Sequence, residues 1–98
     1  MIGIAVSRFN PDVTSRLLKN CLAALKAGGV KEADLRVLRV PGGYELPWAV
    51  NELARIKGCE IVIALGCILK GSTPQNDHIA RSTVSHLHDI TLATRVPV

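Results

Sequence analysis

Two glycine-rich turns divide the chain, and each lies between a short apolar run and a longer amphipathic segment. The first turn is Val40–Pro47 (VPGGYELP), and the second is Gly66–Gln75 (GCILKGSTPQ). Apolar runs of five or six residues are typical of buried strands, and apolar residues at helical spacing follow each turn. Strands that alternate with helices in this way predict an α/β fold with a parallel sheet and right-handed crossovers.

The sequence predicts three strands and three helices. Strands are expected at Ile2–Val6, Asp34–Val40 and Glu60–Leu65, and helices at Val13–Ala27, Leu46–Ile56 and from Thr73-Pro74 to about Thr94. Because Ile61–Leu65 is apolar on both faces, it is predicted to be the central strand. Val96–Val98 is expected to open a fourth strand.

Local signals refine these helices. Gly28-Gly29 is a typical C-terminal glycine pair for the first helix. Thr73 is predicted as the N-cap of the third helix, with Pro74 at its first position. The inner side of the second helix is predicted to carry Trp48, Ala49, Val50, Leu53 and Ile56.

Composition narrows the class of protein. With 98 residues there is room for one domain, and 48% hydrophobic but only 3% aromatic residues imply an aliphatic core. The net charge of +4 comes without a block of like charges or interleaved aromatics, so small anions are favoured over nucleic acid as ligands. Three cysteines without a C-x-x-C pair, and the lack of a signal-peptide pattern, indicate reduced thiols and a cytoplasmic location. No apolar run approaches the ~20 residues of a membrane span.

Both glycine turns follow strands of a parallel sheet, so they are expected at the same carboxyl edge. Open α/β sheets bind ligands at this edge. Helix N-termini there favour phosphates and other anions. The pattern therefore predicts a site for a small polar ligand that carries a phosphate.

Three segments carry a resemblance to a known family. Ile4–Asn10 (IAVSRFN), Val40–Pro47 and Ala64–Pro74 (ALGCILKGSTP) closely resemble the 6,7-dimethyl-8-ribityllumazine synthase family, in the same order and with similar spacing. Leu92–Val98 continues the resemblance, which covers essentially the whole chain. It implies a flavodoxin-like three-layer sandwich with a parallel sheet, as one domain over residues 1–98 that is incomplete at its C-terminus.

The resemblance also implies an activity. The family condenses 5-amino-6-(D-ribitylamino)uracil with 3,4-dihydroxy-2-butanone 4-phosphate in riboflavin biosynthesis, releasing phosphate and water. It uses no metal and no organic cofactor. Its subunits form homopentamers or icosahedral sixty-subunit shells with active sites between neighbours, and riboflavin synthase is a further partner. No contact with nucleic acid or membrane is implied.

Site residues follow from the same resemblance. Phe9 would stack on the pyrimidinedione ring, and the backbone of Ile68 and Leu69 would meet that ring. The ribityl side would be held by the first turn and its acid, namely Gly42, Gly43, Tyr44 and Glu45. The phosphate would bind at Gly71, Ser72 and Thr73. Asn10 is predicted to shape its turn and cap the first helix, with a substrate contact as the alternative.

Two departures from the family bear on catalysis. Gln75 stands where the family usually has a proton-transferring His, and a glutamine can hydrogen-bond but cannot titrate. His78, one helical turn later, is a candidate substitute, whereas His86 and His88 are expected at the surface or an interface. The second departure is length, because family members continue into a further strand and C-terminal helices.

These departures leave alternatives open. The chain could be a catalytically weakened relative that binds flavin or lumazine, or that builds a shell as a scaffold. An unrelated flavodoxin-like regulatory or nucleotide-binding domain is a third reading, and it requires the three matching segments to be accidental.

Overall fold

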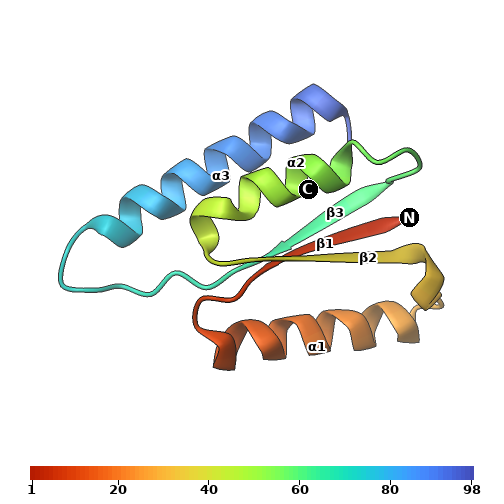
Figure 1. Cartoon of the computed structure of the whole chain (residues 1–98), viewed down its shortest axis with the longest axis horizontal. Helices are drawn as coiled ribbons and strands as arrows, with labels where there is room; N and C mark the ends of the chain where they lie inside the picture. The colour runs from red at the N-terminus through yellow and green to blue at the C-terminus, as the bar shows by residue number, and fades with distance from the viewer.

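A computed structural model describes all residues, Met1–Val98, and shows a parallel sheet between two layers of helices (Figure 1). The strands are β1 (Ile2–Ser7), β2 (Leu35–Val40) and β3 (Ile61–Leu65). The helices are α1 (Pro11–Ala27), α2 (Leu46–Ala54) and α3 (Gln75–Thr94), with 3₁₀ turns η1 (Glu32–Asp34) and η2 (Gly43–Glu45) before β2 and α2. The predicted alternation of strand and helix is confirmed.

The strand order is β2-β1-β3, so the central strand is β1 and the prediction of a central Ile61–Leu65 is wrong. In the register, Ile4 of β1 lies between Val37 and Ile63. β3 is apolar on both faces because α1 lies on one face and α2 on the other. The apolar run therefore indicates that helices cover both faces of β3. It does not indicate that other strands pair with both edges of β3.

Residues 96–98 form no strand, which corrects the expected fourth strand. One hydrogen bond joins this segment to the outer edge of β3, from Val62 N to Pro97 O at 2.9 Å. The sheet described here therefore has three strands.

The side chains of β1 alternate between the two helix layers. Ile4 and Val6 pack with Leu18 of α1, whereas Ala5 faces the larger cluster under α2. Gly3 also faces α2, and a Cβ there would lie 3.0 Å from the Cβ of Leu53. Figure 1 shows α1 on one side of the sheet and α2 with α3 on the other. This three-layer arrangement, with the order 2-1-3, confirms the flavodoxin-like α/β class.

Two details of the helices differ from the predictions. Trp48 is 58% exposed, because the buried face of α2 runs through Leu46, Ala49, Val50 and Leu53, and a residue two positions after Leu46 points elsewhere. α2 also ends at Ala54, so Ile56 follows the helix, although it packs against the core.

The start of α3 also differs. Pro74 occupies the N-cap position without a side-chain cap, and its carbonyl accepts hydrogen bonds from Asp77 N and His78 N. Thr73 is therefore not the N-cap, since it lies one residue too early. None of the helices is both long and apolar enough to cross a membrane.

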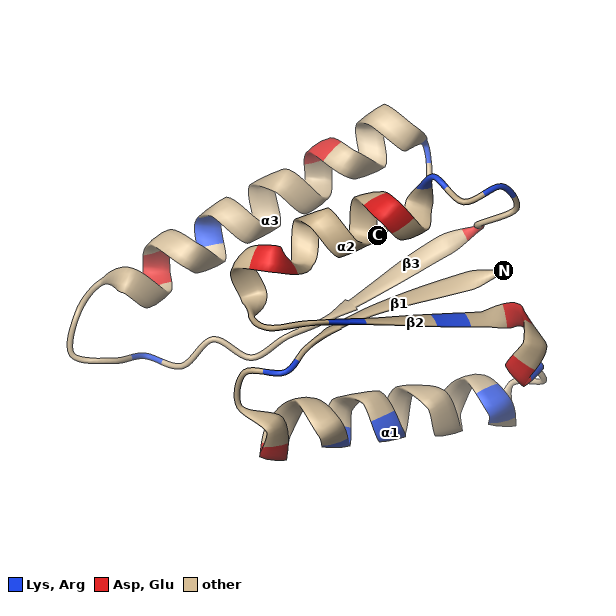
Figure 2. Ribbon diagram, viewed as in Figure 1, with Lys and Arg blue, Asp and Glu red and all other residues tan.

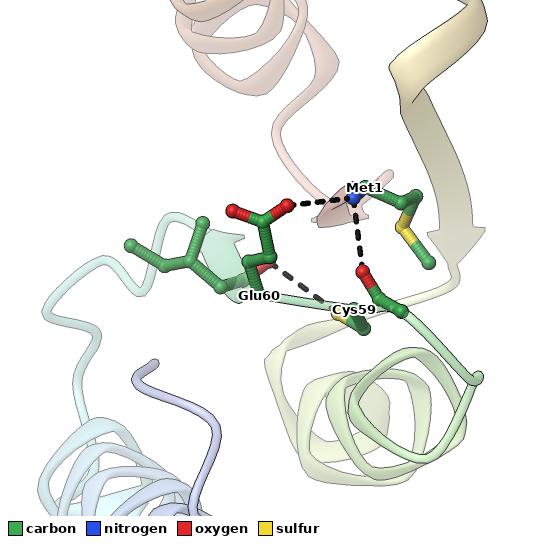
Figure 3. A network of polar contacts seen from close by, with 5 residues as sticks. Met1, Cys59 and Glu60 are labelled. Atoms are coloured by element: carbon green, nitrogen blue, oxygen red, sulfur yellow. Dashed lines mark hydrogen bonds and ion pairs between the residues drawn. The ribbon is translucent and has the colours of Figure 1, made fainter.

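The amino edge of the sheet is held by the chain terminus (Figure 3). The Met1 ammonium donates to Gly58 O at 3.0 Å and lies 3.5 Å from Oε1 of Glu60. Cys59 Sγ donates to Ile61 O at 3.6 Å. The Met1 contacts join the beginnings of β1 and β3, at the end of the sheet opposite the loops that follow the strands (Figure 1).

Candidate functional site

The three loops that leave the carboxyl ends of the strands enclose a cleft of about 320 Å³. The loops follow β1, β2 and β3, and because the strands are parallel they meet at one edge of the sheet. Nine of the residues named from sequence line this cleft, namely Phe9, Gly42, Gly43, Tyr44, Ile68, Leu69, Gly71, Thr73 and Gln75. The structure thus brings the two glycine turns together around one space.

Four other residues named from sequence lie outside the lining of the cleft: Asn10, Glu45, Ser72 and His78. Ser72 and His78 are exposed, at the loop before α3 and in its first turns. Asn10 and Glu45 instead make hydrogen bonds that shape the loops around the cleft.

Asn10 connects the loop after β1 to the loop after β3. Its side-chain Nδ2 donates to Cys67 O at 3.3 Å, and its backbone is left-handed, with φ 58°. The predicted side-chain cap of α1 is absent, because the side chain is turned toward Cys67. The backbone carbonyl of Asn10 begins the helix instead, accepting from Val13 N and Thr14 N at 3.0 Å.

Glu45 closes the first glycine turn. Its Oε2 accepts from Gly42 N at 3.0 Å, while its own amide donates to Gly42 O at 3.2 Å. This reciprocal pair satisfies two backbone groups at the start of a helix, as in a capping box. The second carboxylate oxygen makes no hydrogen bond within the chain.

The floor of the first turn is tightly packed. A Cβ on Gly43 would lie 3.3 Å from Cδ1 of Ile68 and 3.9 Å from Cγ2 of Ile79, so the backbone approaches the second loop closely. The carbonyl of Gly43 accepts from Thr83 Oγ1 at 3.3 Å. Hydrogen bonds at this turn use the amides of Gly42 and Glu45 but not those of Gly43 and Tyr44.

Two aromatic rings stand open beside these amides. Phe9 is 62% exposed and Tyr44 is 75% exposed. Phe9 is held in place by its backbone, because Arg8 N donates to Val40 O at 2.7 Å and Phe9 N to Pro41 O at 2.9 Å. These two bonds extend the pairing of β1 and β2 beyond the strands and set Phe9 next to the first turn.

The other wall is formed by the second loop and the beginning of α3. The amide side chains of Gln75 and Asn76 line the cleft in the first turn of that helix. Arg8 and Lys70 lie on the loops after β1 and β3, where Figure 2 shows basic positions, but neither lines the cleft, and Arg8 lines a separate pocket beside α1. The N-terminus of α3 in this wall by itself suits an anionic ligand.

Other ionisable groups do not build a second reactive centre at this edge. No group of three or more His, Cys, Asp or Glu side chains is placed to hold a metal ion. Burial raises the pKa of the Cys21 thiol, which belongs to α1 and packs against the cluster of Ile4, Val6 and Leu18, outside the lining of the cleft.

Sequence reasoning did not assign Cys67, Asn76 and Ile79 to the site, although they line the cleft. Helical spacing from Gln75 could have identified Ile79, which lies four positions later on the same helix face, but it gives no signal for Asn76, which is adjacent in sequence. Thr83 was also missed, since its partner Gly43 is 40 residues away in sequence.

Comparison with known proteins identifies the family of the chain. The model of the 6,7-dimethyl-8-ribityllumazine synthase family matches residues 1–98. The chain is 41% identical over 96 residues to 6,7-dimethyl-8-ribityllumazine synthase of Syntrophus aciditrophicus (strain SB) and 38% identical over 96 residues to that of Aquifex aeolicus (strain VF5). Each match covers 98% of this chain and 62% of the relative, so the chain spans less than two thirds of their length. By this match and by its fold, the chain belongs to the 6,7-dimethyl-8-ribityllumazine synthase family.

Proposed function

We propose that this protein is a lumazine synthase of riboflavin biosynthesis, condensing 5-amino-6-(D-ribitylamino)uracil with 3,4-dihydroxy-2-butanone 4-phosphate to 6,7-dimethyl-8-ribityllumazine. The observation that carries the proposal is the cleft between the two glycine turns, in a chain of this family. The cleft offers an aromatic face, unused backbone amides and a helix N-terminus within one space.

Each part of the cleft suits one part of the substrates. The exposed ring of Phe9 offers a flat apolar face for the pyrimidinedione. The free amides of Gly43 and Tyr44, with the unused oxygen of Glu45, can bond the ribityl hydroxyls. The loop of Gly71, Ser72 and Thr73 before α3 is the place for the phosphate, which a helix N-terminus favours.

The proposed reaction needs little from the protein beyond placement. The amine attacks the ketone, water leaves as the imine forms, phosphate is eliminated and the second ring closes. Holding the two substrates in register makes the condensation effectively unimolecular. No metal or organic cofactor takes part in these steps.

The cleft lacks a histidine side chain for the proton-transfer steps of this reaction. Gln75 lines the cleft and can hydrogen-bond a reacting oxygen, but it cannot accept or release a proton at neutral pH. His78 is exposed outside the lining, so it reaches the reacting atoms only through water or after a local rearrangement. We therefore attribute most of the rate enhancement to the positioning of the two substrates and little of it to acid–base catalysis.

The proposal includes an assembly and a location. The open cleft and its exposed aromatic rings suit a homo-oligomer, a pentamer or a sixty-subunit shell, in which a neighbouring copy covers the substrates. The enzyme would act in the cytoplasm and pass its product to riboflavin synthase.

The test is an absorbance assay for lumazine formation from the two purified substrates. The wild-type protein should exceed the uncatalysed rate, and Gln75→His should raise kcat by about tenfold or more, since acid–base catalysis contributes typically ~10²–10⁴. His88→Gln, an exposed histidine farther along the same helix, is the matched control and should leave the rate unchanged.

Two results would count against the proposal. A folded, oligomeric wild-type protein without turnover would indicate a binding or scaffold relative. If the wild-type enzyme is active and Gln75→His leaves kcat unchanged, the residue at position 75 has no role in proton transfer.

A further inference from the structure

Thr83 is a buried hydroxyl in an otherwise apolar face of α3. The inner face of this helix carries Ile79, Thr83, Leu87 and Ile90, and Thr83 is only 7% exposed. Leu87 and Ile90 pack against the main core, as helical spacing predicts. A hydroxyl in such a face requires a hydrogen-bond partner.

The partner that Thr83 uses is not in its own helix. Thr91 and Thr94, in the same helix, donate to the carbonyls four residues earlier, Leu87 O and Ile90 O. Thr83 instead donates to Gly43 O in the first glycine turn, at 3.3 Å. This hydroxyl therefore joins α3 to the wall of the cleft formed by η2.

The bond acts on a peptide group that faces the proposed substrates. The carbonyl of Gly43 and the amide of Tyr44 belong to the same trans peptide plane and point in opposite directions. Holding the carbonyl toward Thr83 therefore also sets the direction of the Tyr44 N–H, which makes no hydrogen bond in the turn. The same carbonyl also accepts from Leu46 N within the 3₁₀ turn, so the Thr83 hydroxyl is the second restraint on this peptide plane and the one that comes from α3.

Both walls of the cleft are connected through this bond. The first turn of α3 supplies Gln75 and Asn76 to one wall, and Gly43 and Tyr44 lie on the other. Thr83, two turns into the helix, fixes the second wall to the first.

From this geometry we infer that Thr83 is a positioning residue of the lumazine synthase site. It holds the Tyr44 amide in the orientation that binds the ribitylaminouracil, and it does not touch the substrate itself. The inference rests on the proposed function for its choice of substrate, whereas the restraint on the turn can be measured without any turnover.

The kinetic test compares three variants. Thr83→Val keeps the shape of the side chain and removes the donor, and Thr83→Ser keeps the donor. Thr91→Val is the matched control, because it removes a 3.3 Å hydroxyl–carbonyl bond of the same helix at a site remote from the turn.

Thr83→Val should raise KM for the ribitylaminouracil by about five- to tenfold, the size expected from one lost hydrogen bond. KM for the butanone phosphate should stay within about twofold, since its loop is untouched. Thr83→Ser should restore wild-type KM within about twofold, and Thr91→Val should match the wild type. An unchanged KM in Thr83→Val would overturn the inference, and so would an equal rise for both substrates, which indicates general damage to the fold.

Amide hydrogen exchange provides the second measurement. The peptide covering residues 42–46 should exchange faster in Thr83→Val than in the wild type, Thr83→Ser or Thr91→Val. Equal exchange in all four proteins would overturn the inference. If the wild type shows no turnover, the proposed function fails, and exchange at residues 42–46 alone decides whether Thr83 holds the turn.

Discussion

Gly66 lies where the loop after β3 passes over the first residue of α2. A Cβ at this position would lie 2.8 Å from Cδ1 of Leu46, which is only 4% exposed and has little room to move. The glycine therefore allows α2 to begin directly against the candidate site.

Gly66→Ala should lower the free energy of unfolding by about 1–3 kcal/mol, the usual cost of overpacking. Gly71→Ala is the control, because no atom lies within 4 Å of the new methyl group. Urea denaturation at one fixed protein concentration measures both. Equal stability of the two variants would contradict the close approach of Leu46.

Ser7 carries a buried polar atom that has no hydrogen-bond partner. Its Oγ makes no hydrogen bond, although the residue is 2% exposed. Thr14 is equally buried, but its hydroxyl donates to Asn10 O at 3.3 Å.

Ser7→Ala should therefore leave the free energy of unfolding unchanged or raise it by up to about 1 kcal/mol, since an unpaired buried hydroxyl is costly. Thr14→Val should lower it by about 1 kcal/mol, because it removes a hydrogen bond that is made. Thermal unfolding of both variants tests this difference. A loss of stability in Ser7→Ala as large as that in Thr14→Val would show that Ser7 has a partner.

Individual site residues could be predicted only where the sequence around them is distinctive. Phe9 and the two glycine turns stand out as local patterns, and the structure places them around one cleft. Thr83 gave no such signal, because a threonine in a helix ordinarily bonds within its own helix. The hydrogen bond from Thr83 to Gly43 joins residues far apart in sequence, so it can be identified only in the folded structure.

Among the elements, α1 has the most clearly defined end. Gly29 has φ +92°, and the amides of Gly29 and Val30 donate to Lys26 O and Leu25 O at 3.0 Å. This pair of bonds is a Schellman motif, in which a left-handed residue terminates the helix. The glycine pair predicted this end correctly.

Gly29→Ala should lower the free energy of unfolding by about 1–2 kcal/mol, because an L-residue is strained in the left-handed region. Gly28→Ala is the adjacent control, since Gly28 has φ −80° and the nearest atoms to a new Cβ are at 3.5 Å. Both are compared by urea denaturation. A Gly29→Ala protein as stable as Gly28→Ala would contradict the motif.

The order of the strands could not be predicted from their composition. Burial on both faces makes β3 apolar, but the helices provide that burial, and the pattern carries no information about edge neighbours. The position of Trp48 was mistaken for a related reason. Its apolar character suggested the core, whereas the spacing of the buried residues of α2 excludes it.

The molecule as a whole has few buried residues. Only 15 of 98 residues are buried, and large apolar side chains remain exposed around the cleft, on α2 and on α3, among them Tyr44, Leu69, Trp48, Val84 and Leu92. A small core and exposed apolar surface are typical of subunits that associate.

Light scattering coupled to size-exclusion chromatography should therefore give a mass several times the 10.5 kDa of one chain. Trp48→Glu should lower this mass or weaken the assembly, since a charge would replace an exposed indole. A well-folded monomer in the wild type would contradict the proposed oligomer.

A crystal structure of the protein with 6,7-dimethyl-8-ribityllumazine tests most directly whether the two glycine turns form a single ligand site. The ring system is expected against Phe9 and the ribityl chain along Gly42–Glu45, with Thr83 still bonded to Gly43. Ligand bound on another surface, or an empty cleft at saturating ligand, would contradict this expectation.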